Sequence, residues 1–264
     1  MIKAMLAAAA LPALLFATGA AAQDNDAPKE PRRFRVGVGP QVTPDHPGSD
    51  KVSVSPLFNL STARGDTPFD FSAADQSASI DLVDTGGFAF GPAFNLEGSR
   101  RRDETDLPVD EVGVSAEVGG FAQFWLGSSI RARGELRKGV SGHKGLVGNI
   151  MLDYVARDGD KWLFSVGPRV SLSDNKYQDA YFGVNPAAAL RTGLAPYNPG
   201  GGVHAVGAGA TTIFQIDRSW GIYGYAKYDR LVSDAADSPI VRTIGSRNQF
   251  SGGAALTFTF GGGR

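Results

Sequence analysis

The chain has 264 residues with 26 basic and 27 acidic side chains, and this near-neutral balance argues against nucleic acid as a partner. It contains no cysteine, which excludes disulfides, thiolate metal sites and a lipid-anchored N-terminal cysteine. Its 35 glycines exceed the usual share of about 7%, and their spread through alternating segments indicates tight turns and narrow, curved strands.

Residues 1–22 are predicted to be a cleaved signal peptide. Lys3 supplies a positive start, residues 5–17 form an apolar run, and residues 20–22 offer small side chains for cleavage. The apolar run is too short to span a membrane comfortably, which disfavours an N-terminal anchor. Residues 23–33 are polar and contain prolines, so we expect a disordered periplasmic lead-in.

Alternating apolar and polar residues then recur to the end of the chain. The last run, residues 250–260, places Phe250, Phe258 and Phe260 on one face and small polar residues on the other. Weaker candidate strands lie near 67–72 and 77–83. The stronger runs lie at about 36–42, 52–60, 88–96, 112–126, 130–136, 146–154, 162–172, 206–216 and 220–231.

These runs predict an all-β fold, a transmembrane antiparallel β-barrel of about twelve strands (10–12) over residues 34–264. A soluble β-sandwich is the alternative, but runs longer than the usual five or six residues favour a tilted membrane crossing. The terminal run should pair with the first, near Val36 to Val42. Pro40, Pro92 and Pro168 each follow a glycine and remove a ladder donor, so we expect β-bulges there.

The connections between the runs alternate in length. Short connections at 127–128, 158–160 and 217–218 are expected on the periplasmic side, because bacterial barrels have short periplasmic turns. The long connections are expected outside, and they lie at 43–50, 97–110, 173–202 and 232–248.

Residues 130–137 place four charged side chains, Arg131, Arg133, Glu135 and Arg137, on the polar face of one strand. Facing a wet lumen, these charges could tune ion passage. Alternatively, they could pair with Glu117, Glu135 or Asp153 and plug a narrow barrel. The sequence leaves both readings open.

The long connection 173–202 is too aromatic for a disordered loop. Asn185 and Pro186 predict the start of a short helix, and Tyr181 and Phe182 need burial, so we expect this segment to fold over or into the barrel mouth. An exposed apolar patch that recruits a partner is the alternative. In residues 97–110, the arginines 100–102 could contact lipopolysaccharide phosphates, or the loop could simply be solvated.

No catalytic, cofactor or metal site is predicted. His46, His143 and His204 do not lie in a nucleophile motif, and no spacing matches a metal-binding pair or a calcium loop. Asp234 and Asp237 could bind a cation, but a turn-forming role fits them better. We therefore expect a protein that is not an enzyme.

From about residue 35 to 260 the chain resembles the MipA/OmpV family of outer-membrane proteins, named for a member that interacts with the lytic transglycosylase MltA. The resemblance includes Asp237, Ser238 and Pro239, which we take with Tyr181 and Phe182 as candidate partner or mouth residues. The landmark segments are 44–50, 181–184, 193–197, 201–203, 228–231, 234–241 and 245–249.

This resemblance implies a non-enzymatic barrel in the Gram-negative outer membrane, surrounded by outer-membrane lipid and lipopolysaccharide. It implies a scaffold that links a lytic transglycosylase and a penicillin-binding protein to that membrane, with a narrow pore or a surface-exposed adhesion barrel as alternatives. Two departures are His46, where the family often has tyrosine, and a tail beyond Phe260. The landmark loops fall on the predicted outer side, whereas a periplasmic scaffold needs a periplasmic surface.

Overall fold

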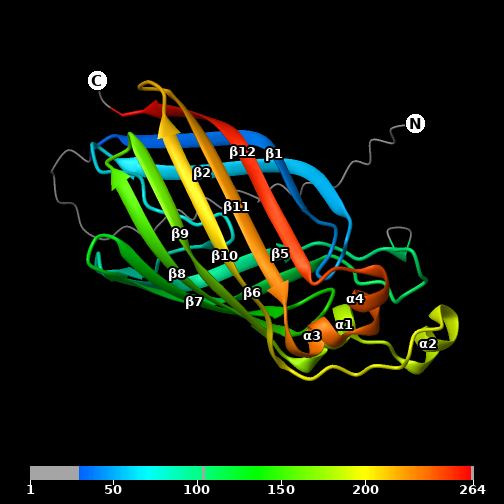
Figure 1. Cartoon of the computed structure of the whole chain (residues 1–264). Helices are drawn as coiled ribbons and strands as arrows, with labels where there is room; N and C mark the ends of the chain where they lie inside the picture. The colour runs from blue at the N-terminus through cyan, green and yellow to red at the C-terminus, as the bar shows by residue number, and fades with distance from the viewer. Residues whose placement is uncertain (1–29, 103–104, 263–264) are drawn as a thin grey trace, which may run out of the picture.

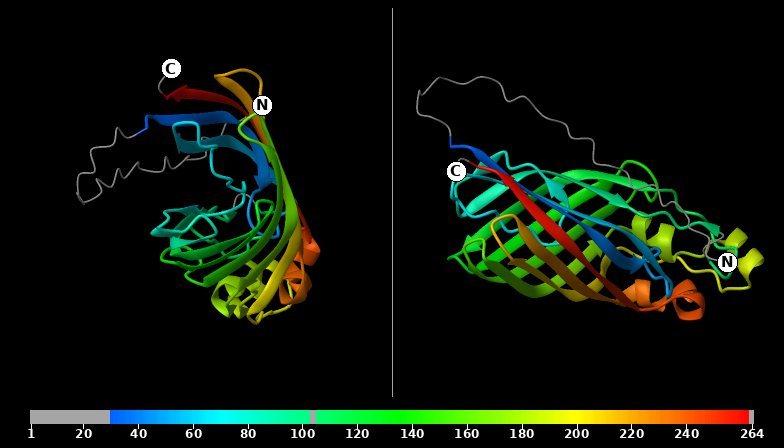
Figure 2. Two further views of the ribbon diagram at one scale, coloured as in Figure 1. Left: turned by 90° about the vertical axis from the view of Figure 1, so that its left-hand side faces the viewer. Right: turned by 90° about the horizontal axis from the view of Figure 1, so that it is seen from above.

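The computed structural model describes residues 30–102 and 105–262, and they form one antiparallel sheet with helices at one end (Figure 1). The strand order is β2-β1-β12-β11-β10-β9-β8-β7-β6-β5-β3, and β4 also pairs with β5. Seen along the strands, the sheet curls into a wall with one seam (Figure 2). Within the described residues no ladder joins β2 to β3 or β4 across that seam.

Ten strands are long and two are short. The two-residue strands are β3 (Ala78–Ser79) and β4 (Val83–Asp84). The long strands are β1 (Arg32–Pro44), β2 (Val52–Arg64), β5 (Phe88–Glu97), β6 (Ser115–Leu126), β7 (Ile130–Gly139), β8 (Leu146–Asp158), β9 (Trp162–Ser173), β10 (Gly202–Gln215), β11 (Trp220–Leu231) and β12 (Asn248–Gly261).

The four helices are α1 (Asn175–Phe182), α2 (Pro186–Thr192), α3 (Ser233–Asp237) and α4 (Pro239–Ile244). The predicted start of α2 is confirmed, because the Asn185 side chain accepts a hydrogen bond from the Ala188 amide and Pro186 occupies the first turn. None of the described helices has the length and apolar content needed to cross a membrane.

The alternation of side chains divides the sheet into two faces. Phe124, Leu136, Ile150 and Leu256 are exposed on the outer face, while Arg131 and Asp153 on the inner face are fully buried. An exposed apolar outer face over a polar interior is the arrangement of a barrel wall in lipid. The alternation in the sequence therefore predicts the outer and inner faces of the sheet correctly.

The predicted pairing of the last strand with the first is confirmed. In the β1·β12 ladder Val36 lies opposite Phe258 and Val42 lies opposite Gly252. The predicted count of twelve strands is also confirmed. The candidate strand at 67–72 is wrong, since these residues pair with no strand, and the candidate at 77–83 is reduced mainly to β3.

The predicted N-terminal boundary needs a small correction. Arg32 and Arg33 belong to β1, where they pair with Arg64 and Ala63 of β2, so the barrel begins before residue 34. The predicted signal peptide at 1–22 and most of the lead-in at 23–33 lie outside the described residues.

The expected bulges at Pro40, Pro92 and Pro168 are wrong. Beside Pro40 the β1·β12 pairs stop after Val38 and resume at Gln41 in the same register, and Pro92 and Pro168 also keep their register. The preceding glycine explains this, because a Cβ on Gly39 would lie 1.9 Å from the Ala254 carbonyl oxygen. A glycine thus lets the neighbouring backbone approach closely, and the ladder tolerates the missing donor without inserting a residue.

The two ends of the barrel differ as the sequence predicts. The short turns 127–129, 159–161 and 216–219 lie at one end with Arg32 and Gly261, and we call this the short-turn end (Figure 1). The long connections gather at the other end, where Ser49 pairs with Gly245 in an isolated bridge. We call this second end the mouth platform, and it comprises residues 45–51, 98–102, 105–114, 140–145, 174–201 and 232–247.

Candidate functional site

The inner face of β7 carries the four charged residues that the sequence singles out, and all four are buried. Arg131 contacts Asp153 at 2.7 Å, and Asp153 also contacts Arg169 at 2.7 Å. Arg137 lies 2.8 Å from Glu117 and also pairs with Glu135. The structure therefore contains the pairing that the sequence left open as one of two alternatives.

Residues 65–77, which we call the inserted segment, run from the end of β2 into the lumen (Figure 2). The Asp75 carboxylate lies 2.8 Å from Arg169 and 3.9 Å from Lys227. The Ser77 hydroxyl donates to Glu135 at 2.6 Å, and Arg131 donates to the Gln76 side chain at 2.7 Å. Charged strand residues thus hold the segment from several sides.

Two aromatic side chains fix the other half of the inserted segment. The guanidinium of Arg35 lies 4.1 Å from the centre of the buried Phe69 ring, and that of Arg131 lies 4.4 Å from the Phe71 ring. Phe71 also packs edge-on against Trp125. The backbone amide of Phe69 donates to Asp160 in the turn 159–161. These contacts hold the segment inside the barrel near the short-turn end.

The charges of the ion-pair network around β7 balance. Burying an unpaired charge is expensive, so buried charges need partners of opposite sign with good contacts. The basic residues of this network are Arg131, Arg133, Arg137, Arg169 and Lys227, and the acidic ones are Asp75, Glu117, Glu135, Asp153 and Asp229. Nearer the short-turn end, Arg33 and Arg35 share Asp160.

His143 belongs to this network. Its Nδ1 accepts a hydrogen bond from the Gly145 amide, so the ring hydrogen lies on Nε2, which donates to Glu117 at 2.9 Å. The contact gives Glu117 a third kind of partner beside Arg137 and Asn95. His143 is therefore a structural residue in the turn 140–145.

The mouth platform is built around Tyr181 and Phe182, the last residues of α1, which are both 0% exposed. They pack with Val147 of β8, Leu231 of β11 and apolar residues of α3 and α4. The Asp174 side chain caps α1 by accepting from the Tyr177 amide. The predicted burial of the aromatic residues at the mouth is confirmed.

Ser238 joins the two landmark loops. Its hydroxyl donates to the Phe182 carbonyl oxygen at 2.7 Å and accepts from the Ile240 amide at 3.2 Å, while Pro239 begins α4. Asp237 is exposed and lies 3.2 Å from Arg247. The five predicted mouth residues are thus brought together, but three are buried and only Asp237 offers an exposed charge.

The position of Arg100 contradicts its predicted contact with lipopolysaccharide. The residue is almost fully buried, and its guanidinium donates to the carbonyl oxygens of Asp110, Ala180 and Tyr181. Two of these are terminal carbonyls of α1, which have no partner within the helix. Burial lowers the pKa of Arg100 to about 10. Arg100 therefore fastens α1 and cannot contact lipopolysaccharide, a role that nothing in the sequence indicated.

A polar cavity of about 440 Å³ lies between the inserted segment and the mouth platform. Asp75 and Lys227 line it from one side, and Tyr177 and His204 line it from the platform side. The described residues contain no group of three or more histidines, cysteines and acids that could hold a metal ion. His46 also borders the cavity, and burial lowers its pKa.

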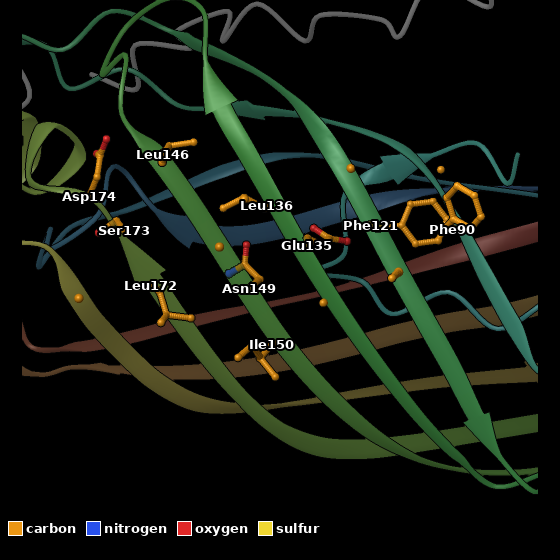
Figure 3. Close-up of a pocket in the computed structure, with 16 residues that line it drawn as sticks. Phe90, Phe121, Glu135, Leu136, Leu146, Asn149, Ile150, Leu172, Ser173 and Asp174 are labelled. Carbon is orange, nitrogen blue, oxygen red and sulfur yellow. The ribbon is translucent and has the colours of Figure 1, made fainter. Parts of the chain in front are cut away.

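The outer face carries an open apolar groove of about 900 Å³ across β5 to β9 (Figure 3). Leu136, Ile150 and Leu172 line it, and glycines such as Gly134 and Gly148 make it shallow. These residues lie on the lipid-facing side of the wall, so the groove is part of the membrane surface.

The sequence did not predict four charged residues of the lumen network, namely Asp75, Arg169, Lys227 and Asp229. Arg169, Lys227 and Asp229 sit at inward positions of predicted strands, so the alternation alone could have found them. Asp75 gave no such signal, because its role depends on the path of the inserted segment through the lumen.

The sequence profile described as MltA-interacting protein MipA matches residues 36–260. No curated protein matches the chain significantly. An outer membrane channel from Pseudomonas putida F1 is 10% identical, covering 91% of this chain and 100% of that chain with a TM-score of 0.43. The translocator domain of the autotransporter NalP from Neisseria meningitidis is 12% identical, with 91% and 90% covered and a TM-score of 0.39. With TM-scores below 0.5, these likenesses carry no argument about function.

Proposed function

The chain belongs to the MipA family of MltA-interacting proteins, and on that premise we propose that it is a non-enzymatic scaffold for a peptidoglycan-remodelling enzyme. It is an outer-membrane β-barrel, in keeping with its family and the apolar outer face of its wall. A lytic transglycosylase is the first candidate partner, because the family name records that interaction. A penicillin-binding protein is the second.

The observation that carries this proposal is the inserted segment held inside the lumen. The inserted segment is bound to β7, β9 and β11 through Asp75, Gln76 and Ser77. A barrel with this segment inside it is better suited to hold a partner at the membrane than to conduct solutes. A barrel whose interior is occupied can contribute its two end surfaces to binding. This favours a scaffold over the narrow pore, which is the alternative.

The histidines support a non-enzymatic role. The Ser173 hydroxyl lies 3.0 Å from Nδ1 of His204, whereas the nucleophile of a serine triad bonds to Nε2 of its histidine. Within the described residues, no carboxylate hydrogen-bonds to His204 to orient its ring. Both residues are also buried beneath α1, where Tyr177 packs against His204.

The short-turn end is the face we propose for the murein enzyme. Because the short turns lie there, the rule that bacterial barrels have short periplasmic turns directs it to the periplasm. Lys161 is 80% exposed in the turn 159–161, and Arg218 is exposed in the turn 216–219. The enzyme would contact such exposed turn residues.

A second candidate function follows from the same orientation. The mouth platform would face the cell exterior, where Leu190 of α2 is 89% exposed. A large ordered surface at that position favours a surface-exposed envelope or adhesion barrel. The two candidates differ in the end of the barrel that binds.

Orientation is tested first, with single cysteines introduced into a chain that has none. We expect Leu190→Cys to react with a membrane-impermeant maleimide on intact cells, and Lys161→Cys to react only after the outer membrane is opened. The reverse pattern would place the mouth platform in the periplasm and make it the scaffold face.

The partner is tested by cross-linking envelopes and purifying the tagged full chain. We expect a lytic transglycosylase to be enriched with wild type and with Arg242→Glu on the platform, and to be lost with the double variant Lys161→Glu and Arg218→Glu. Absence of the enzyme from wild-type eluates would reject the scaffold. Loss only with Arg242→Glu would move binding to the platform.

A further inference from the structure

The outer face of β11 and β12 is marked by two aromatic pairs. Trp220 and Phe258 lie 4.8 Å apart near the short-turn end, and Tyr228 and Phe250 lie 4.8 Å apart near the mouth platform. Eight residues of strand separate Trp220 from Tyr228, or about 27 Å along the strand. With the usual tilt this is about 20 Å across the membrane, close to the apolar band of an outer-membrane barrel.

Arg230 is the next outward residue beyond Tyr228, so it lies at the level where lipid headgroups begin. Its Nη1 donates to the Asn248 side chain at 2.9 Å, and the Tyr228 hydroxyl reaches the same oxygen at 2.8 Å. This bond uses one of the five donors of the guanidinium. Arg230 is therefore oriented by its neighbours and keeps donors for a ligand.

Arg230 shares an open groove of about 550 Å³ with Arg242 of α4 and Arg247. Among the described residues, the carboxylate that forms ion pairs with these cations is that of Asp237, at 4.0 Å from Arg242 and 3.2 Å from Arg247. The groove is thus net positive at a membrane interface. Guanidinium groups suit phosphate oxygens because they offer paired, parallel N–H donors.

The surface directly below the groove is smooth. Directly below Tyr228 and Phe250 the outward residues of β11 and β12 are small, and they pair as Gly224 with Ala254 and Ala226 with Gly252, before the larger pair of Ile222 with Leu256. Ala210 of β10 continues this surface beside Ala226. Small side chains allow close packing of a straight hydrocarbon chain, so headgroup and chain surfaces lie one above the other.

We propose that this surface is a binding site for lipid A, with its phosphates on Arg230, Arg242 and Arg247 and its acyl chains over the small residues of β11 and β12. The outer leaflet is the source in the proposed orientation, in which the long loops of the mouth platform face the cell exterior. The site is independent of the scaffold partner, which we place at the other end.

Native mass spectrometry of the detergent-purified full chain, titrated with bis-phosphorylated lipid A, tests the site. Lysine and arginine near a membrane surface each contribute about 1 kcal/mol, so Arg230→Gln with Arg242→Gln should weaken binding roughly thirty-fold. Lipid A without phosphates should bind wild type as weakly as intact lipid A binds the variant. Arg64→Gln with Arg218→Gln at the short-turn end is the matched control and should bind like wild type.

Thermal unfolding in lipid-free detergent checks that the variants fold, and either single substitution can replace the double variant, with roughly a five-fold loss expected. Equal binding by wild type and the double variant would overturn the site. Equally tight binding of phosphatidylglycerol would overturn the assignment to lipid A, as would labelling that places the platform in the periplasm.

Discussion

The lumen and the mouth platform are both buried, but opposite kinds of interaction hold them. The lumen contains small apolar clusters and a network of buried ion pairs, in which Arg131, Asp153 and Arg169 each depend on the others. In the platform the buried side chains are mostly apolar, and Arg100, the one buried charge among its described residues, is satisfied by backbone carbonyls. The lumen should therefore respond to loss of charge, and the platform to loss of packing and caps.

Asp153→Ala should give the largest effect. It leaves the guanidiniums of Arg131 and Arg169 buried without their shared partner, and breaking such a pair costs about 3–5 kcal/mol. The free energy of unfolding, from urea titration in detergent, measures this. Asp158→Ala on the same strand removes an exposed pair with Lys161 and should cost at most about 1 kcal/mol. Equal losses in the two variants would contradict a charge-held lumen.

Asp75→Asn should loosen the inserted segment by about 1–3 kcal/mol at neutral pH, because Arg169 and Lys227 each lose the charged partner that ties them to this segment. Hydrogen exchange of residues 65–77 measures this. Asp66→Asn, which changes an exposed carboxylate of the same segment, should leave the protection unchanged.

The pH dependence of wild type follows from the same residue, which lies outside the spanning strands. Burial would raise the pKa of Asp75, but Lys227 and Arg169 lower it below its ordinary value. The stabilisation is therefore complete above the unfolded pKa of about 4 and is lost as the pH falls through the lower folded pKa. Exchange protection should hold from pH 8 to 5 and decline below about 4. A decline centred near pH 6 would contradict this assignment.

Ser238→Ala should give the smallest effect, about 1 kcal/mol, confined to the mouth platform. It removes the donor to the Phe182 carbonyl oxygen and the cap of α4. Exchange at Ile240 should quicken equally in low and high salt, because no ion pair is involved. Thr243→Ala, exposed on the same helix, is the control. Loss of this effect in high salt would contradict a mouth platform that is held by packing and helix caps.

The wall of the barrel could be predicted because each spanning strand must present apolar residues at every second position. That periodicity alone located the β1·β12 pairing and the inward charges of β7. The inserted segment could not be predicted, because Phe69 and Phe71 alternate like wall residues although they face charged side chains inside. The burial of Arg100 could not be predicted either, because its partners are backbone carbonyl oxygens, which every residue carries.

The central claim is that the inserted segment fills the lumen, and ion conductance in planar bilayers tests it most directly. Wild type should insert and carry no steady current. A variant with residues 67–77 replaced by a glycine-serine linker of equal length should conduct, provided that urea titration shows it folded. A steady wild-type current equal to that of the linker variant would contradict a filled lumen and favour the narrow pore as the function.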